Sequence, residues 1–456
     1  MQPSSDNLGP GAVFRFTIDE RNFVYSARQD KLFEEVGSAE GHEDGNCPIW
    51  TGEDSPGLQF PPPALTLRLR TIEFVITGAC NLDCTYCATR DRYKLPNGRN
   101  DRLMQKTAIA ALGLLRPHMD KAGITLKFFG GEPLLGMNVI EKIIEQVETW
   151  RVQSKNVVAT NGLLLSDGTV DFLVEHRFLT FISLDGPPKI HDANRVDHRG
   201  RGSYEKVLEK IMRFKQRYPR EFASNVIINM VVTPQFAGRF QEQVDHLLAL
   251  GIRKTQINPN ECVPTSSRAT WYTPREWEDM QDEKARTRSR LIAQSELDSS
   301  HDSQDCFQIY AGLNVTRKTG SNATDIEREE GGTLCADCQS DEWSTVTVLP
   351  DGGITSCIEF NRSASVEFGN VKAGKLDLDA FAAFQQAFRK SVREGPCANC
   401  WAIHACRMVE CYKAFATAGA NLRWQRTEDC DTIREELAPR FRDAVKLYLL
   451  RKEVTI

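Results

Sequence analysis

Three cysteines stand close together in the segment Cys80-Asn-Leu-Asp-Cys84-Thr-Tyr-Cys87, just after an apolar run. Iron–sulfur clusters of the cubane type are normally held by four cysteine thiolates. Three thiolates can therefore hold three irons and leave the fourth iron open, where a small molecule can bind and react. A zinc site or buried thiols are the alternatives, although structural zinc prefers four ligands and this triplet has no local fourth partner.

A second chemical signal is Phe128-Phe-Gly-Gly-Glu-Pro-Leu134, which follows a β-rich run. The adjacent glycines Gly130 and Gly131 let the backbone approach a ligand without a Cβ in the way. The carboxylate of Glu132 suits a cationic group. The sequence therefore predicts a ligand site on this loop, with a simple turn as the alternative.

Together, the cysteine triplet and the Gly-Gly-Glu-Pro motif resemble the radical S-adenosylmethionine enzymes. The resemblance implies a [4Fe-4S] cluster whose free iron chelates the amino and carboxylate groups of S-adenosylmethionine. One electron from the cluster then cleaves the sulfonium and gives a 5′-deoxyadenosyl radical. The implied cofactor-binding residues are Tyr86 at the adenine, Gly130, Gly131 and Glu132 at the methionine amino group, Thr160 and Asn161 along the cofactor, Ser183 at the ribose, and Arg195 at the carboxylate. Asp185 is expected to be an N-cap or turn residue and His191 a surface or packing histidine.

The elements that must position these residues alternate between β-rich and amphipathic runs. The expected strands are Thr71–Ile76, Ile124–Phe129, Asn156–Thr160, Leu179–Leu184, Asn225–Val232 and Lys254–Ile257. The expected helices are Leu103–Met119, Val139–Val152, Gly168–Glu175, Tyr204–Arg217 and Phe240–Leu250. Helical crossovers imply parallel strands, so the fold class is α/β, a partial (βα)6 barrel. The chemistry of such barrels sits at the carboxyl ends of the strands, where the cysteine triplet falls.

The regions flanking the barrel define the expected domains. Residues 1–66 predict a hairpin around Asp19-Glu-Arg-Asn22 and a short helix at Lys31–Val36. This region resembles a reduced leader-peptide recognition domain, and a strand pair that plugs the barrel base is the alternative. The barrel is expected over residues 67–297 and closes with a helix that begins at a capping box in Thr273-Pro-Arg-Glu276. A bridge over residues 298–332 leads to a cysteine-rich domain at 333–456.

The C-terminal cysteines resemble the SPASM domain, which carries two auxiliary [4Fe-4S] clusters. The resemblance implies one cluster on Cys397, Cys400, Cys406 and Cys430, and another on Cys335, Cys338, Cys357 and Cys411. The short Cys335–Cys338 spacing leaves open whether the second cluster has four protein ligands or three and an open iron. Zinc is the alternative here too, because two C-x2-C units can form a zinc ribbon.

Composition excludes several classes of protein. The 456 residues are 41% hydrophobic and 26% charged, as in ordinary globular proteins. The net charge of −5 gives no sign of nucleic-acid binding. Neither an apolar run long enough for a membrane span nor a signal peptide is visible, so a cytoplasmic location is expected. Fourteen cysteines without an export signal favour metal binding over disulfides.

The combined resemblance, from about residue 70 onward, implies an enzyme that modifies peptides or proteins. The expected reaction is hydrogen abstraction from a ribosomally made precursor peptide, followed by loss of a second electron through an auxiliary cluster to close a carbon–carbon or thioether crosslink. Flavodoxin or ferredoxin is the expected electron donor. The alternatives are peptide epimerisation and anaerobic sulfatase maturation, whose enzymes carry an aspartate where this chain has Ile358, leaving Glu359 as the candidate base. An iron–sulfur or zinc scaffold is the non-enzymatic alternative.

Overall fold

The computed structural model describes residues 13–18, 21–26, 31–35, 67–87, 102–262, 272–297, 345–356 and 367–383, and single positions at 386, 400, 434 and 438. The chain divides into two compact units. One contains Met1–Leu65, Tyr310–Glu342 and Asp379–Ile456, and the other contains Thr66–Ile309 and Trp343–Leu378. The second unit holds the cysteine triplet and the Gly-Gly-Glu-Pro motif.

In the first unit, a small antiparallel sheet has the order β1-β2-β3. Its strands are β1 (Val13–Ile18), β2 (Arg21–Ser26) and β3 (Lys31–Glu35). The expected hairpin is confirmed, and the rings of Phe16 and Phe23 stack with centroids 5.7 Å apart. The helix expected at 31–36 is wrong, because this segment pairs with β2 along its whole length. So short a helix is marginal on its own, and hydrogen bonding to a strand edge overrides it.

The second unit is built on one large sheet of order β13-β12-β11-β10-β4-β5-β6-β7-β8-β9. Six neighbouring strands, β4 to β9, run parallel, as the sequence predicts. Their bounds are β4 (Thr71–Thr77), β5 (Ile124–Gly130), β6 (Ser154–Thr160), β7 (Phe178–Ser183), β8 (Val226–Val232) and β9 (Ile257–Glu261). The last strand begins later than expected, because residues 254–256 form a 3₁₀ turn.

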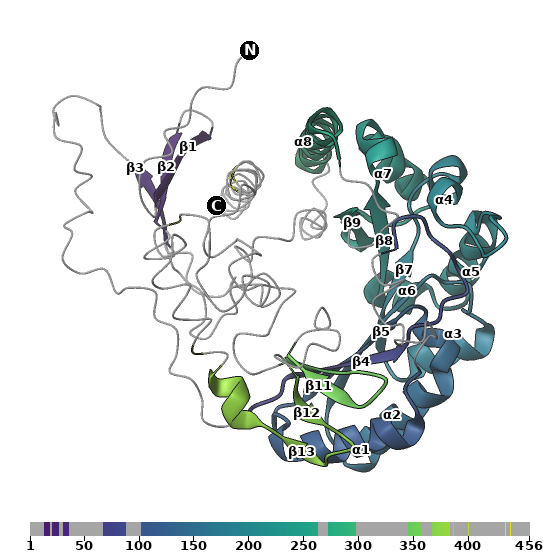
Figure 1. Ribbon diagram of the computed structural model, residues 1–456. Coiled ribbons are helices and arrows are strands. Elements are labelled where there is room, and N and C mark those ends of the chain that lie inside the picture. The colour runs from purple at the N-terminus through teal and green to yellow at the C-terminus, as the bar shows by residue number, and fades with distance from the viewer. Residues whose placement is uncertain are drawn as a thin grey trace. The chain divides into compact units, whose positions relative to one another are not determined.

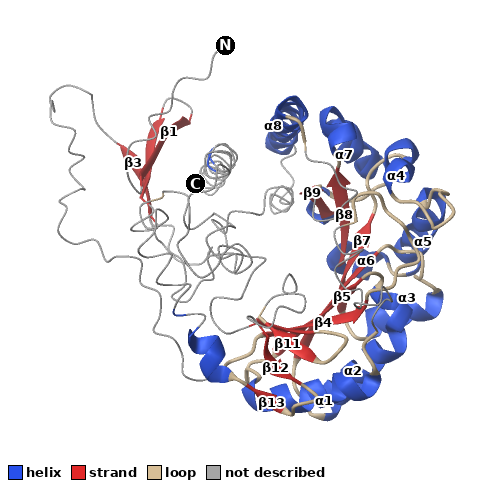
Figure 2. Cartoon of the chain, in the orientation of Figure 1, coloured by secondary structure: helices blue, strands red, loops and turns tan. Residues whose placement is uncertain are grey.

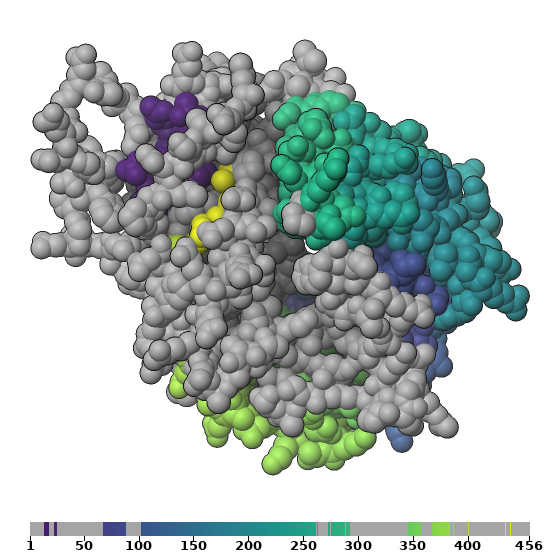
Figure 3. Space-filling model, turned by 45° about the horizontal axis from the view of Figure 1, so that its top comes forward, coloured from purple at the N-terminus to yellow at the C-terminus, as the bar shows by residue number. Residues whose placement is uncertain are grey.

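Helices line the convex side of this curved sheet (Figures 1 and 2). They are α1 (Gln105–Leu115), α2 (Met137–Thr149), α3 (Asp167–Glu175), α4 (Pro188–Asn194), α5 (Tyr204–Arg217), α6 (Pro219–Asn225), α7 (Phe240–Ala249) and α8 (Pro274–Leu297), with 3₁₀ turns at Arg116–His118, Pro133–Gly136 and Pro234–Arg239. The sequence did not predict α4 and α6. In the space-filling view, the described residues that are coloured from blue to green form a continuous surface (Figure 3). Among the described helices, none has the length and apolar character needed to cross a membrane.

The two faces of the parallel sheet differ in burial. Along residues 124–129 of β5 and along all of β7, residues alternate between buried and partly exposed. Side chains of a strand alternate between faces, so one face is sealed and the other is partly open. The sealed face contains the stacked rings of Phe74 and Phe128, 5.9 Å apart, with Phe178 beside them. The partly open face is the one available to ligands.

Four C-terminal strands continue the barrel sheet. They are β10 (Thr345–Val348), β11 (Gly353–Thr355), β12 (Glu367–Asn370) and β13 (Lys375–Leu376). β10 pairs parallel to β4, and the hydroxyl of Thr347 donates to the buried Glu73 carboxylate at 2.9 Å. A long-range strand pairing thus ties residues 345–348 to the first barrel strand, while the expected domain boundary between 332 and 333 lies outside the described residues.

Helix α8 begins at the expected capping box. The hydroxyl of Thr273 accepts from the amide of Glu276 at 3.3 Å, and the Glu276 carboxylate accepts from the Thr273 amide at 2.7 Å. These two bonds satisfy amide donors that a helix start leaves without intrahelical partners.

Replacing Thr273 by Ala should weaken the first turn of α8 by about 1 kcal/mol, because the side-chain cap is lost. Amide hydrogen exchange in that turn should then accelerate about fivefold. The control is Glu278→Gln, an exposed position on the same helix, which should leave exchange unchanged. Equal exchange in the Thr273→Ala variant and the wild type would show that the cap does not stabilise α8.

Candidate active site

The three cysteines lie on the loop that leaves the carboxyl end of β4. Cys80, Cys84 and Cys87 are free thiols, and each is partly buried. Two amides point at the first sulfur: the backbone amide of Leu82 lies 3.4 Å from Cys80 Sγ, and the side-chain amide of Asn161 lies 3.6 Å from it. Donors of this kind stabilise a thiolate once it forms.

The thiols share one electrostatic environment. Burial raises the pKa of Cys80 to about 11, with Cys87 among the neighbours that raise it further. Burial likewise raises the pKa of Cys84 to about 12, while the charge of Arg195 lowers it and the other two thiols raise it. The raised pKa values keep Cys80 and Cys84 protonated at neutral pH, and a nearby positive charge, such as that of a bound metal, would favour their ionised form.

Two glycines bring the end of β5 into contact with the start of the cysteine loop. The amide of Gly131 donates to the Thr77 carbonyl at 2.7 Å, and the amide of Glu132 donates to the Ala79 carbonyl at 2.8 Å. Gly130 has a φ of +146°, and a Cβ at either glycine would collide with the backbone of residues 77–79. The two glycines are thus required for the loops to meet, which is a packing role beside the expected role at the cofactor.

Glu132 is fully buried at this junction. Its carboxylate accepts hydrogen bonds from the amide of Leu134 at 3.1 Å, the hydroxyl of Thr160 at 2.8 Å and the amide of Asn161 at 2.8 Å. All three donors are neutral. Within the described residues, no cationic side chain pairs with this carboxylate.

The electrostatics of Glu132 favour binding of a cation. Burial raises its pKa from 4.5 to about 7, and the three hydrogen bonds only partly offset that effect. Because the folded pKa lies above the unfolded value, folding takes up a proton between about pH 4.5 and 7, and the ionised carboxylate costs stability above pH 7. An ammonium group placed beside Glu132 removes that cost by lowering its pKa.

Thr160 and Asn161, expected along the cofactor, link Glu132 to the cysteine loop. Besides its bond to Glu132, Asn161 donates from its side chain to the side-chain oxygen of Asn81 at 2.7 Å. Both residues are buried at the end of β6. The ends of β4, β5 and β6 therefore form one hydrogen-bonded group around Cys80 and Glu132.

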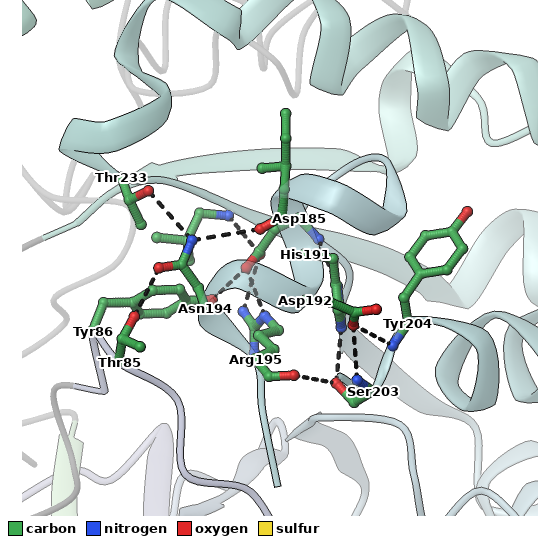
Figure 4. A network of polar contacts seen from close by, with 12 residues as sticks. Thr85, Tyr86, Asp185, His191, Asp192, Asn194, Arg195, Ser203, Tyr204 and Thr233 are labelled. Carbon is green, nitrogen blue, oxygen red and sulfur yellow. Dashed lines mark hydrogen bonds and ion pairs between the residues drawn. The ribbon is translucent and has the colours of Figure 1, made fainter. Parts of the chain in front are cut away.

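A second group surrounds Asp185, directly after β7 (Figure 4). Its buried carboxylate accepts from the Tyr86 hydroxyl at 2.6 Å, from Arg195 Nε at 2.8 Å and Nη2 at 3.2 Å, and from the Val231 amide at 2.9 Å. The Arg195 guanidinium lies over the Tyr86 ring, 5.3 Å from its centroid. Arg195, expected at the cofactor carboxylate, is thus paired with Asp185, and its contact with the cofactor stays a prediction.

Residues 194–198 brace the cysteine loop. The amide of Thr85 donates to the Asn194 carbonyl at 2.9 Å, and that of Asp83 donates to the Val196 carbonyl at 2.7 Å. The Thr85 hydroxyl also donates to the Asn194 side chain at 2.7 Å, and His198 Nε2 lies 2.9 Å from the Cys80 carbonyl oxygen. The loop is therefore fixed on this side by backbone and side-chain bonds together.

His191 is a buried packing residue, one of the two roles expected for it. Its Nδ1 accepts from the Asp185 amide at 3.3 Å, so its Nε2 donates to the Ser203 hydroxyl at 3.0 Å. Burial lowers the pKa of His191 to about 4. The imidazole is thus neutral at physiological pH and holds the turn that carries Asp185.

Ser183 lies on the partly open face of β7. It is in register with Asn229 of β8, which is in register with Asn258 of β9. Asn258 donates to the Asn229 side-chain oxygen at 2.8 Å. The Ser183 hydroxyl has no hydrogen-bond partner within the described part of the chain, which leaves it available to a ligand.

The expected auxiliary-cluster ligands and Glu359 lie outside the described residues, with one exception. Cys400 is a partly buried free thiol, and Arg434 Nη1 lies 4.0 Å from its sulfur. The positions outside are Cys335, Cys338, Cys357, Cys397, Cys406, Cys411 and Cys430. Their roles stay predictions.

Asp185, Asn194 and His198 were missed by sequence reasoning. Asp185 was expected to be an N-cap or turn residue, yet it is fully buried and binds both the nearby Arg195 and the distant Tyr86. The available signal was an acid placed directly after a buried strand, with an arginine ten residues later. That signal cannot identify Tyr86 as the third member, because the contact spans 99 residues.

Residues 74–247 match the sequence profile of the Radical SAM superfamily. This stretch is a radical SAM domain. It contains the cysteine triplet, the Gly-Gly-Glu-Pro motif, Ser183 and Arg195, so all the expected cofactor residues fall inside it.

Among curated relatives, the chain is similar to the cysteine-type anaerobic sulfatase-maturating enzyme of Clostridium novyi. The two are 32% identical over 160 residues, which cover 33% of this chain and 41% of that protein. The chain thus spans less than half the length of this relative. The matched stretch does not by itself establish the activity of the whole protein.

Two solved structures share the fold. Native anSMEcpe with bound AdoMet and Cp18Cys peptide aligns with a TM-score of 0.56 at 18% identity, covering 84% of this chain and 99% of that one. Streptococcus suis SuiB bound to precursor peptide SuiA aligns with a TM-score of 0.54 at 16% identity, covering 80% of this chain and 76% of that one. At these identities the likeness establishes the fold alone.

The residues fit the cofactor that the radical SAM domain implies. Glu132 is a buried carboxylate that has only neutral donors and no cationic partner in the described structure, which suits it to accept hydrogen bonds from a metal-bound amino group. Among the described residues, no three His, Cys, Asp or Glu side chains converge on a single metal ion. A cubane does not require such convergence, because each thiolate binds a different iron.

Replacing Gly131 by Ala should separate the ends of β4 and β5, because the new Cβ collides with backbone that cannot rotate away. Overpacking of this kind costs about 1–3 kcal/mol. Amide exchange of Gly78 to Leu82 should therefore accelerate. Gly113→Ala in α1 is the control, since nothing lies within 4 Å of its Cβ. Unchanged exchange in both variants would contradict the packing role of Gly131.

Proposed function

We propose that this protein is a radical S-adenosylmethionine enzyme that modifies a ribosomally made precursor peptide by forming an intramolecular carbon–carbon or thioether crosslink. The observation that carries the proposal is the junction of β4, β5 and β6. There, a loop with three cysteines meets a buried carboxylate that has no cationic partner among the described residues. A cluster-bound amino acid satisfies both features, because its iron-bound amino group still carries N–H donors that the carboxylate can accept.

The chain's own residues would bind and orient this cofactor. Cys80, Cys84 and Cys87 would hold a [4Fe-4S] cluster, and the Glu132 carboxylate would accept hydrogen bonds from the methionine amino group. Ser183 would bind the ribose on the partly open face of the sheet, and Arg195 would bind the carboxylate with the donors that Asp185 leaves free. When bound, S-adenosylmethionine and the cluster supply a 5′-deoxyadenosyl radical that takes one hydrogen atom from the substrate.

Crosslinking also requires the loss of a second electron and a proton from the substrate. We assign the electron to an auxiliary cluster, with Cys400 among the ligands of one such cluster, and the proton to a base for which Glu359 is the candidate. The substrate peptide would bind the N-terminal region as a reduced leader-recognition domain. A cytoplasmic donor of low potential, flavodoxin or ferredoxin, would reduce the cluster at Cys80–Cys87.

Anaerobic sulfatase maturation is the second candidate. The similarity to the Clostridium novyi enzyme supports it. Ile358, which stands where those enzymes are expected to carry an aspartate, favours crosslinking instead. A non-enzymatic iron–sulfur or zinc scaffold would not explain the buried Glu132 carboxylate or the partly open sheet face beside Ser183.

Replacing Cys80, Cys84 and Cys87 together by Ala should abolish cleavage of S-adenosylmethionine, because no cluster remains to deliver the electron. Anaerobically purified variant protein should still contain the auxiliary iron. The measurement is 5′-deoxyadenosine formed in the presence of dithionite, alongside iron per chain. Cleavage that survives the triple change would contradict the assignment, and a colourless zinc-loaded wild type would exclude the cluster.

The substrate can be tested by anaerobic co-expression with a short peptide encoded beside this gene. A crosslink removes two hydrogens, so the peptide should lose about 2 Da only with the wild-type enzyme. The triple Ala variant is the control. An unchanged mass with deuterium uptake from solvent would indicate epimerisation, and formylglycine in a co-expressed sulfatase would indicate the second candidate.

A further inference from the structure

We infer that Asp185 is a positioning residue that fixes the cluster-bearing loop and Arg195 in one arrangement at the carboxyl ends of β7 and β8. This inference rests on the proposed function for its catalytic consequence. The structural part of the inference, that Asp185 holds the cysteine loop in place, is independent of any bound group.

The hydrogen bonds that Asp185 accepts use all the acceptor positions of its carboxylate. An ionised carboxylate offers about four acceptor positions. Here Oδ2 accepts from Tyr86 and Arg195, and Oδ1 accepts from Arg195 and the backbone of β8. The side chain is 1% exposed. A saturated and buried carboxylate has no site left for a substrate proton, so Asp185 acts through its neighbours rather than as a base.

The pairing also determines which part of Arg195 is available. Asp185 binds the Nε and Nη2 donors along one side of the guanidinium. Nη1 has no partner within the described residues. The adjacent Nη1–Nη2 edge of the guanidinium still presents two N–H donors, so a carboxylate can bind there in a planar geometry while Asp185 stays paired with Nε and Nη2.

Tyr86 connects this pair to the cluster. It stands between Cys84 and Cys87, and its hydroxyl is the group of the cysteine loop that reaches Asp185 (Figure 4). On the other side, Asp185 follows Ser183 by two residues, and the Asp185 carbonyl accepts from Gln243 of α7 at 2.6 Å. Asp185 therefore couples the cluster loop to the strand end that carries the expected ribose contact.

The same chain contains a chemically matched control. On the surface between α3 and α5, Asp171 accepts from Arg217 Nε at 3.0 Å and Nη2 at 2.9 Å, and from the Tyr218 hydroxyl at 2.7 Å. The Arg217 guanidinium lies 5.5 Å from the Tyr218 ring centroid. This group of Asp, Arg and Tyr has the same side-chain types as the group around Asp185, but its Asp and Arg side chains are 42% and 43% exposed.

The first experiment is hydrogen exchange on the protein without cluster or S-adenosylmethionine, comparing Asp185→Asn and Tyr86→Phe with Asp171→Asn and Tyr218→Phe. The amides of Asp83 and Thr85, which donate to the 194–196 segment, report on the loop. Loss of a buried charged hydrogen bond should accelerate their exchange by tenfold or more, on the order of the energy of such a bond. The two surface variants should leave these amides unchanged.

The second experiment uses the reconstituted and reduced protein. Addition of S-adenosylmethionine should change the electron paramagnetic resonance spectrum of the wild type, and the affinity measured from this change should fall about 10- to 100-fold in Asp185→Asn. Tyr86→Phe, which keeps the Asp185–Arg195 pair, should retain more affinity than Asp185→Asn and should still loosen the loop.

The outcomes distinguish the positioning role of Asp185 from the proposed function of the protein. Equal exchange at residues 83 and 85 in all four variants and the wild type would overturn the positioning role. Faster exchange in Asp185→Asn and Tyr86→Phe, but not in the two surface variants, supports the positioning role. This conclusion holds even if the folded wild type fails to bind S-adenosylmethionine. Such a failure would overturn the proposed function instead. Loss of S-adenosylmethionine binding in Asp185→Asn with unchanged loop exchange would also overturn the role, because the effect would then not pass through the loop.

Discussion

The close backbone contact between residues 77–79 and Gly130–Gly131 is the constraint on which the rest of the site depends. It joins the carboxyl ends of the first two barrel strands through two hydrogen bonds, and it leaves no room for a Cβ. The contact places the cysteine loop beside Glu132. Thr160 and Asn161 then extend the same group of hydrogen bonds to the third strand end. An α/β scaffold thus brings three cysteines and a buried carboxylate to one location.

The site contains two buried carboxylates, Asp185 and Glu132, which differ in their hydrogen-bond partners. Asp185 is paired with Arg195 and saturated with hydrogen bonds, so it provides rigidity. Glu132 has only neutral donors among the described residues, and burial raises its pKa to about 7. It therefore gains most from a cationic ligand. One carboxylate fixes the architecture, and the other supplies the free energy for binding a positively charged group.

The sequence predicts those parts of the molecule that depend on local pattern. The parallel strands β4 to β8, most of the long helices and the capping box at Thr273 follow from short-range periodicity and turn residues. The strand at 31–35, the pairing of β10 with β4 and the contact of Tyr86 with Asp185 were not predicted. Each depends on a partner distant in sequence or on a competing strand edge, and neither is visible in a local pattern. The expected cofactor residues were located by motif, but their mutual contacts required the structure.

The most direct test of the account is whether S-adenosylmethionine binds an iron of the cluster at Cys80, Cys84 and Cys87. Electron–nuclear double resonance of the reduced protein, with S-adenosylmethionine labelled with ¹⁵N at the methionine amino group and ¹³C at the carboxylate, measures this contact. The account predicts hyperfine coupling to both labels, together with loss of both couplings when the three cysteines are replaced. A reduced, iron-loaded wild-type protein that binds labelled S-adenosylmethionine without either coupling would contradict it.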